Sequence, residues 1–288
     1  MKNIIITTDG YLWYYENQDH LLPTREDEWS YIEILKEIGD KESIFIDVGA
    51  HVGRYTIRLA KYYKKVIAIE PHPESVQILR KNIEINKLDN VEVYEYAIGE
   101  GLGEGILHHY GGSSTFLSAP SQKQFKVKFT SLDLLITECT PCKTVIKIDV
   151  EGLEVAVLKG AKRILNECKP ILLIELHELR GVKPLQGIHD EVKKILHDFI
   201  ELDVGDCHKL YVHKDIDMLA NIKKFKRAIA MHWANHTIRN VQKGTVWYYG
   251  LPYTWWWGMS QLEFILKIFE HVENEPEWVN LLYKHHKD

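Results

Sequence analysis

Residues 45–55 read FIDVGAHVGRY, an apolar run that ends in an acid and is followed by two glycines four positions apart. The stretch 43–49 (SIFIDVG) has the continuous apolar character of a strand buried on both faces of a parallel sheet. Gly49 allows a tight turn and a close approach of the backbone to a ligand, and Gly53 allows the next helix to begin close against the sheet. The stretch therefore predicts the strand, turn and helix that open a ligand-binding α/β fold.

Apolar runs and helical periodicities alternate in the residues that follow. Further strands are expected at 65–70, 91–99, 144–150 and 170–176, helices at 54–64, 71–88 and 153–165, an alternating run that turns helical after the cap Ser131 at 125–136, a glycine-rich loop with one hairpin at 99–116, and a closing hairpin at 199–206 and 209–214. Strands that alternate with helices at this spacing predict a parallel sheet covered on both faces.

Composition limits the classes of partner. The chain has 288 residues, of which 45% are hydrophobic, enough for one large domain or a domain with an appendage. A net charge of -5 gives no general attraction to nucleic acid, so no nucleic-acid partner is expected. No apolar run approaches the roughly 18 residues of a membrane span, and the first residues lack the apolar length of a signal peptide. The protein is therefore expected to be located in the cytoplasm.

The four cysteines are too few for a disulfide framework in a chain of this length. Cys139 and Cys142 form a lone CTPC, which can bind a metal or cross-link. No second pair of cysteines or histidines follows at the spacing of a zinc site. We therefore interpret CTPC as a turn that carries two thiols.

Two acids and two glycines indicate the kind of ligand. A dinucleotide fold requires GxGxxG, but position 51 is His51 where that motif needs glycine. Asp47 suits a ligand with a positive ammonium or sulfonium better than a diphosphate. Glu70 ends the second strand, 21 residues after Gly49, where a carboxylate accepts hydrogen bonds from both hydroxyls of a ribose. Each residue alone can serve as a cap or turn, but the set in this order favours S-adenosylmethionine.

Six stretches carry a family resemblance, in order, from about residue 42 to 180, roughly half the chain. They read FIDVGAHVGRYTIRLAK, VIAIEPHPESVQILRKNIEIN, AIGE, SLDLL, KIDVEGLEVAVLKGAKRIL and PILLIELHE. This set resembles the FkbM family of class I S-adenosylmethionine-dependent methyltransferases. The resemblance implies a Rossmann-like α/β fold with a mostly parallel seven-stranded sheet and helices on both faces. It also implies transfer of a methyl group, commonly to a hydroxyl of a sugar or a macrolide-type natural product.

The resemblance also implies which residues bind the cofactor. The methionine part would be held by Asp47, Gly49, Ala50 and Gly53, the ribose by Glu70, and the adenine would be lined by Ala97 and Ile98. A stretch (N/D)PP(Y/F), usual in enzymes that methylate the exocyclic amine of a base, is replaced by DVEG at 149–152. Amino methylation of DNA is therefore not expected.

Catalytic candidates follow two adjacent strands. His177 is the preferred general base because its unperturbed pKa lies near neutrality, Asp149 would orient the cofactor's amino group or the acceptor, and Glu151 would face the substrate. Glu151 can instead complement a helix dipole. Asp149, Glu151 and a carboxylate from Glu175 or Glu178 can also collect Mg²⁺, although no fixed ligand spacing assigns a metal site.

Three segments are expected. Residues 1–41 form an N-terminal segment that can serve as a lid over the acceptor site, 42–214 the methyltransferase domain, and 215–288 a mainly helical, aromatic-rich C-terminal extension. The tryptophans of TWWWGM (254–259) can stack sugar rings, lie at a membrane interface, or pack against the main domain or a second subunit in a homo-oligomer. Acceptor specificity is expected in the N-terminal segment, in residues 101–124 and in the extension.

The leading hypothesis is an S-adenosylmethionine-dependent O-methyltransferase that acts on a hydroxyl of a carbohydrate or related polar metabolite. One alternative is methylation of nitrogen or carboxylate on a protein or lipid-linked acceptor. Another, from a different class, is a scaffold protein that keeps the nucleotide pocket and engages a partner through its aromatic extension. Intact Asp47, Gly49, Gly53 and Glu70 argue against decay of the pocket.

Overall fold

The computed structural model describes residues 3–26, 28–110, 113–115, 123–178, 184–205, 207–218, 220–221 and 223–232. Most of the expected C-terminal extension, including TWWWGM, lies outside the described residues. No helix in the described ranges has the length and apolar character needed to cross a membrane.

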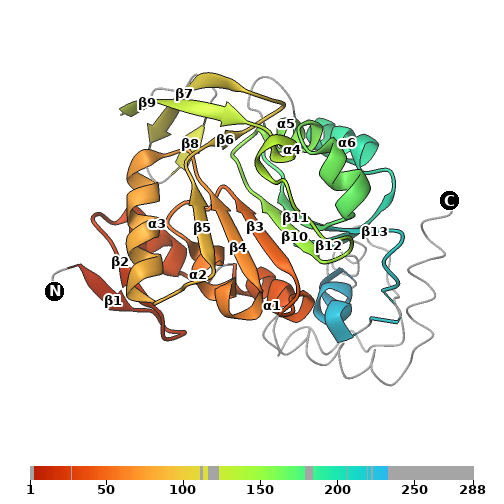
Figure 1. The fold of residues 1–288 in the computed structure, drawn as a ribbon, viewed down its shortest axis with the longest axis horizontal. Helices are drawn as coiled ribbons and strands as arrows, with labels where there is room; N and C mark the ends of the chain where they lie inside the picture. Colours follow the sequence, from red (N-terminus) through yellow and green to blue (C-terminus); the bar gives the residue numbers. More distant parts are fainter. Residues whose placement is uncertain are drawn as a thin grey trace, which may run out of the picture.

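A seven-stranded sheet forms the centre of the molecule (Figure 1). Its strands, in spatial order, are β12 (Phe199–Gly205), β13 (His208–His213), β11 (Ile171–Glu175), β10 (Thr144–Ile148), β3 (Ile44–Val48), β4 (Lys65–Ile69) and β5 (Val91–Tyr94). The five strands from β11 to β5 are parallel, whereas β13 runs antiparallel to both β11 and β12. The predicted parallel sheet and its closing hairpin are therefore confirmed.

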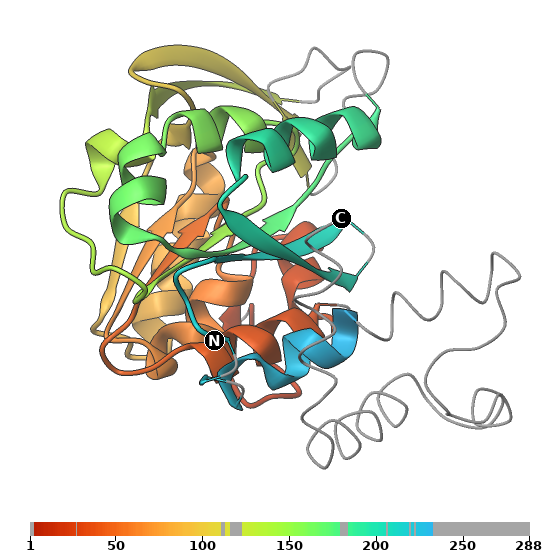
Figure 2. The same cartoon turned by 90° about the vertical axis from the view of Figure 1, so that its right-hand side faces the viewer.

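Helices cover both faces of the sheet because its central strands are apolar on both sides. One face carries α1 (Trp29–Ile38), α2 (Arg54–Leu59), the 3₁₀ turn Ala60–Tyr62, α3 (Pro73–Ile85) and a helix at 223–232; the other carries α4 (Leu132–Leu135), α5 (Glu154–Lys159), the π-helical turn Ile164–Cys168 and α6 (Leu185–Ile195). Figure 2 shows these two helical layers on opposite sides of the sheet. Along β3, Phe45 packs into the first layer and Ile46 into the second.

The predicted strand at 91–99 is wrong as a single element. It divides into β5 and β6 (Ala97–Ile98), and β6 belongs to a separate four-stranded sheet. That sheet also contains β7 (Gly103–Tyr110), β8 (Ser113–Thr115) and β9 (Lys123–Thr130). The hairpin expected in the glycine-rich stretch is present as β7 and β8, but β7 pairs mainly with β9, which supplies seven antiparallel partners. The residues expected to be loop therefore form a second sheet beside the first.

The N-terminal segment is attached to the body of the fold. It contains the hairpin β1 (Ile4–Ile6) and β2 (Leu12–Tyr14), the 3₁₀ helix Asp19–Thr24 and α1. Trp13 is fully buried, and its Nε1 donates a hydrogen bond to the carbonyl of His20 (2.7 Å). The guanidinium of Arg58, on α2, pairs with Asp9 (Nε–Oδ2 2.6 Å). These buried contacts hold residues 9–24 against α2 and place them near the carboxyl end of β3.

The cysteine prediction requires a correction. Cys139 forms a disulfide with Cys168, 29 residues along the chain, while Cys142 is a free and exposed thiol. The residues just before β10 and β11 lie side by side because these strands are parallel neighbours, and the backbone N–H of Cys142 donates to the carbonyl of Cys168 (2.8 Å). Because Cys139 and Cys168 are 29 residues apart in the sequence, their pairing was not predicted from it.

Candidate active site

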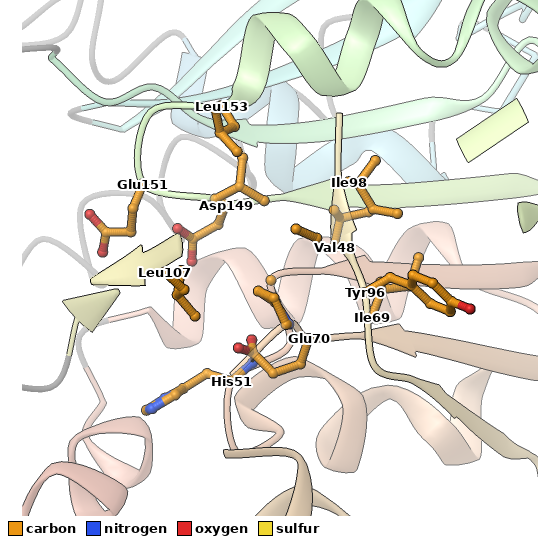
Figure 3. A pocket seen from close by; sticks show the side chains of 14 residues that line it. Val48, His51, Ile69, Glu70, Tyr96, Ile98, Leu107, Asp149, Glu151 and Leu153 are labelled. Carbon is orange, nitrogen blue, oxygen red and sulfur yellow. Dashed lines mark hydrogen bonds between the residues drawn. The ribbon is translucent and has the colours of Figure 1, made fainter. Parts of the chain in front are cut away.

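Strand order reverses between β3 and β10. From β3 the chain proceeds outward through β4 and β5, and later returns to the other side of β3 through β10 and β11. Ligands in open α/β sheets bind beyond the carboxyl ends of the strands at such a point. A cavity of about 160 Å³ lies there (Figure 3). It is lined by Val48, Gly49, His51, Ile69, Glu70, Pro71, Tyr96, Ala97, Ile98, Leu107, Asp149, Val150, Glu151 and Leu153.

The carboxylate of Glu70 is fixed within this cavity. Its Oε2 accepts a hydrogen bond from the backbone N–H of His51 (2.7 Å), and its Oε1 accepts one from the backbone N–H of His72 (2.8 Å). Each carboxylate oxygen keeps a further lone pair for a ligand hydroxyl. Burial raises the pKa of Glu70 to about 7, against the opposing effect of the two backbone hydrogen bonds. The side chain is therefore a preoriented acceptor that titrates near neutral pH.

The turn after β3 depends on both predicted glycines. Gly49 has φ +81°, and a Cβ at this position would lie 1.8 Å from the carbonyl oxygen of Asp149. Gly53 has φ +105°, and its Cβ would lie 2.8 Å from Cδ1 of Leu79 on α3. Gly49 thus brings the ends of β3 and β10 together, and Gly53 brings α2 close to α3. The close approach that Gly49 permits is between its own backbone and the backbone of Asp149, at the end of the neighbouring strand β10.

A buried lysine that the sequence analysis missed joins the ends of β3 and β10. Nζ of Lys147 donates to the carbonyl of Gly49 (2.9 Å) and lies 3.0 Å from Oδ2 of Asp149 and 3.6 Å from Oδ1 of Asp47. Burial disfavours its charge, but Asp149 and Asp47 outweigh that effect and raise the pKa of Lys147. Burial by itself would raise the pKa of Asp149, but the nearby Lys147 and His177 together have the larger effect, so the pKa of Asp149 is lowered. The position of Lys147 inside the otherwise apolar strand TVIKI (144–148) could have indicated in the sequence that this lysine is buried.

Asp47, at the end of β3, is buried and does not line the cavity. Its carboxylate is fully buried, and Oδ2 accepts hydrogen bonds from the backbone N–H (3.1 Å) and Oγ1 (2.6 Å) of Thr56 on α2. Neither Asp47 nor Gly53 lines either of the two cavities described here. In this structure Asp47 connects the end of β3 to the first turn of α2 and to Lys147.

A second cavity of about 150 Å³ adjoins the first and shares Gly49, His51 and Asp149 with it. Its lining also includes Leu22, Pro23, Glu28, Ala50, Arg54, Tyr55 and Lys147. Glu28 forms an ion pair with Arg54 and accepts a hydrogen bond from the hydroxyl of Tyr55 (2.7 Å). Residues of the N-terminal segment therefore form one wall of this second cavity.

The predicted catalytic residues lie together beyond β10 and β11. Asp149 and Glu151 line the first cavity, and in the view of Figure 3 they lie at the end opposite Tyr96. Nε2 of His177 lies 3.8 Å from Oδ1 of Asp149, 3.7 Å from Oε2 of Glu151 and 3.6 Å from Oε1 of Glu175. Glu151 adopts φ +51°, a backbone conformation uncommon for a residue with a side chain.

His177 does not have the pKa assumed in the sequence analysis. Its Nδ1 lies 2.8 Å from Oε1 of Glu154, which is fully buried. Burial disfavours the charged ring, but the hydrogen bond to Glu154 and the negative charges of Asp149, Glu154 and Glu151 raise the pKa of His177 to about 10. The ring then carries a proton at neutral pH, so the reason for choosing His177 as the general base does not hold.

The two residues predicted to line the adenine lie at the first cavity. Ala97 and Ile98 both line it, as part of the short strand β6. Tyr96 and Leu107 line it as well, and the sequence analysis missed both. Leu107 reaches the cavity because β7 belongs to the four-stranded sheet, whereas the sequence predicted a glycine-rich loop with one hairpin at 99–116.

Together, the strand order, the single reversed strand beside β11 and the cavity at the switch point define the Rossmann-like fold of class I methyltransferases. Residues 47–204 match the family model of the methyltransferase FkbM domain over more than half of the chain, and the chain belongs to that family.

Known relatives cover parts of the chain. The hexuronic acid methyltransferase AglP of Haloferax volcanii is 26% identical over 160 residues, which cover 54% of this chain and 64% of that protein. A putative methyltransferase of Dictyostelium discoideum is 44% identical over 70 residues, and the match covers 24% of each protein. The crystal structure of methyltransferase FkbM from Methylobacillus flagellatus KT has 23% identity and a TM-score of 0.44, and covers 61% of this chain and 44% of that one. The chain thus spans about a quarter of the Dictyostelium relative and under two thirds of the Haloferax one.

Proposed function

We propose that this protein is an S-adenosylmethionine-dependent O-methyltransferase that acts on a hydroxyl of a carbohydrate or related polar metabolite. The observation that carries the proposal is the carboxylate of Glu70, held by two backbone N–H groups in a cavity at the switch point of the sheet. Such a carboxylate suits the paired hydroxyls of a ribose. The membership of residues 47–204 in the FkbM family supports methyl transfer as the reaction.

The lining of the first cavity fits the cofactor in three respects. Glu70 offers a free lone pair on each oxygen for the ribose hydroxyls. Ala97 and Ile98 give an apolar wall for the adenine. Asp149 places a carboxylate between the two cavities, where it favours a positively charged ligand. In this proposal Asp47 and Gly53 act indirectly, by holding α2 against the end of β3.

S-adenosylmethionine, when bound, supplies a methyl group on a positively charged sulfur. The protein has to align the acceptor hydroxyl with that group and accept the hydroxyl proton as the oxygen–carbon bond forms and the sulfur–carbon bond breaks, with S-adenosylhomocysteine as the leaving group. Glu151 is the best placed of the predicted catalytic residues to meet the acceptor, because its carboxylate lines the cavity and its side chain is 40% exposed. Asp149, paired with Lys147, is a positioning residue in this scheme.

A polar acceptor is favoured by the carboxylates at this end of the cavity, because they accept hydrogen bonds from hydroxyl groups. The name of the Haloferax relative, a hexuronic acid methyltransferase, also supports a carbohydrate acceptor. Transfer of a radiolabelled methyl group into glycan, protein or lipid fractions separates this proposal from methylation of a protein or lipid-linked acceptor. Label confined to the protein fraction would contradict it.

Replacing Glu70 by Ala is expected to weaken binding of S-adenosylhomocysteine about 100-fold, since two hydrogen bonds to a charged acceptor are lost. Isothermal titration calorimetry measures the change, with NAD as the control ligand. Glu95→Ala is the matched control, because Glu95 is an exposed acid just beyond β5. Equal affinities for the Glu70→Ala and wild-type proteins would exclude Glu70 as the ribose acceptor.

Affinity for S-adenosylhomocysteine is expected to fall about tenfold for each pH unit below 7, because one proton must leave before binding. The pKa of Glu70 is raised to about 7, so lowering the pH protonates the carboxylate that accepts the ribose hydroxyls. Above pH 8 the affinity should be constant. Calorimetry from pH 5.5 to 8.5 tests this, and in Glu70→Gln the slope attributable to this proton should disappear. An unchanged slope in that variant would assign the proton to another group.

A further inference from the structure

Three carboxylates converge on one imidazole nitrogen beside the first cavity. Nε2 of His177 is 3.6 to 3.8 Å from oxygens of Asp149, Glu151 and Glu175, too far for strong hydrogen bonds. Ligand atoms about 2.1 Å from a metal ion lie about 3 to 3.5 Å from one another. One ligand atom each from Asp149, Glu151 and His177 already lies within 4.8 Å of the other two. Shifts of about 1 Å would therefore give a coordination geometry.

The other ring nitrogen of His177, Nδ1, contacts a buried carboxylate. Its Nδ1 meets Oε1 of Glu154 at 2.8 Å, and the side chain of Glu154 is 1% exposed. A metal-binding histidine almost always contacts a carboxylate or carbonyl through its second nitrogen, which orients the ring. The second oxygen of Glu154, Oε2, is buried and has no hydrogen-bond partner among the described residues. Glu154 is thus a buried carboxylate with one oxygen that no described group satisfies.

Local charge supports the same conclusion. Asp149, Glu151, Glu154 and Glu175 surround His177 with four carboxylates. Lys147 balances Asp149, but it is shared with the fully buried Asp47. The four carboxylates still outnumber the two cations, Lys147 and the protonated ring of His177. A divalent cation that replaces the proton on Nε2 of His177 would offset this excess of negative charge.

We propose that Asp149, Glu151 and His177 bind a divalent metal ion, with Mn²⁺ preferred over Mg²⁺. Two carboxylates and one imidazole suit Mn²⁺, whereas Mg²⁺ prefers oxygen ligands alone. Glu154 orients His177, and Glu175 adds negative charge next to Nε2. The sequence left open whether Glu175 or Glu178 joins this group. In the structure Glu175 is the nearer neighbour, and Glu178 is exposed and outside the group.

The site deepens the proposed function and rests on it. Three protein ligands leave coordination positions open, and Asp149 and Glu151 both line the first cavity. An ion there would hold two adjacent acceptor oxygens and lower the pKa of the hydroxyl that is methylated. The acceptor class that fits is a vicinal diol or a hydroxyl next to a carboxylate, as in sugars and uronic acids.

The test uses the full chain without cofactor. Titration with MnCl₂, followed by the electron paramagnetic resonance signal of free Mn²⁺ and by calorimetry, should show one saturable site per chain that binds Mn²⁺ more tightly than Mg²⁺. His177→Asn and Glu151→Gln should each weaken Mn²⁺ binding at least tenfold, while Glu178→Gln should leave it unchanged. Circular dichroism confirms that each variant is folded. Because the side chain of Glu151 is 40% exposed, its variant keeps the test valid if His177→Asn unfolds.

S-adenosylhomocysteine binding is measured on the same samples, so that the two proposals fail separately. Absence of saturable Mn²⁺ binding, or binding unaffected by either ligand variant, overturns the metal site even if S-adenosylhomocysteine binds. Loss of S-adenosylhomocysteine binding alone overturns the proposed function and leaves the metal site in place. Equal affinity for Mg²⁺ and Mn²⁺, lost in both variants, overturns the stated preference for Mn²⁺.

Discussion

Replacing Lys147 by Met is expected to lower the free energy of unfolding by about 3 to 5 kcal/mol, the usual cost of removing one partner of a buried ion pair. Asp47 is fully buried and Lys147 is the cation nearest to its free oxygen among the described residues. Asp149 and the carbonyl of Gly49 would lose the same partner. Asp47 and the carbonyl of Gly49 would thus be left without a positive charge in a poorly solvated region, and Asp149 would keep only the more distant ring of His177.

Urea denaturation measures this change, and Lys159→Met is the matched control. Lys159 also pairs with an acid, Glu100 (3.7 Å), but its side chain is 48% exposed. Exposed pairs contribute about 0 to 1 kcal/mol, so the control should remain close to the wild type. A loss below about 1 kcal/mol in Lys147→Met would mean that water reaches Asp47 and that the lysine is not essential to the fold.

Gly49→Ala is expected to destabilise the protein by about 3 to 5 kcal/mol, the sum of backbone strain and a steric clash. The backbone of Gly49 has φ +81°, and its Cβ would lie 1.8 Å from a backbone oxygen that cannot rotate away. Relief of this clash requires the ends of β3 and β10 to separate. S-adenosylhomocysteine binding should therefore be lost together with stability.

Gly10→Ala isolates the contribution of the dihedral angle. Gly10 has φ +87°, but a Cβ there would meet no heavy atom within 4 Å. That variant should lose only about 1 kcal/mol, the cost of the left-handed conformation for alanine. Thermal or urea unfolding of both variants gives the comparison. Equal losses would show that the contact with Asp149 is relieved by a small shift of the backbone.

Local patterns were sufficient for most of the main sheet. The runs at 43–49, 65–70, 144–150 and 170–176 are mostly apolar, as strands buried between two layers of helices are, so they predicted β3, β4, β10 and β11. Ser131 was predicted as a cap, and its Oγ accepts a hydrogen bond from the backbone N–H of Leu134 (3.3 Å). Helices α1 and α6 were missed. α1 packs Ile32 and Leu35 into the core, and α6 buries Ile188 and Val192.

The candidate site was predicted less evenly. Glu70, Asp149 and Glu151 were named from their positions at strand ends, Ala97 and Ile98 from the family resemblance, and all five line one cavity. Strand ends are readable in sequence because each follows a buried run directly. Lys147 and Glu154 were not identified, since their importance depends on neighbours about 100 and 23 residues away.

The sequence by itself indicated an α/β fold with a parallel sheet, because apolar periodicity and glycine placement act over a few residues. The resemblance of its motifs indicated the family. The tertiary structure alone decided the charge state of His177, the bridging role of Lys147, the disulfide between Cys139 and Cys168 and the second sheet that brings Leu107 to the cavity. Electrostatic energies depend on distance and burial, and both are set only when distant segments pack together.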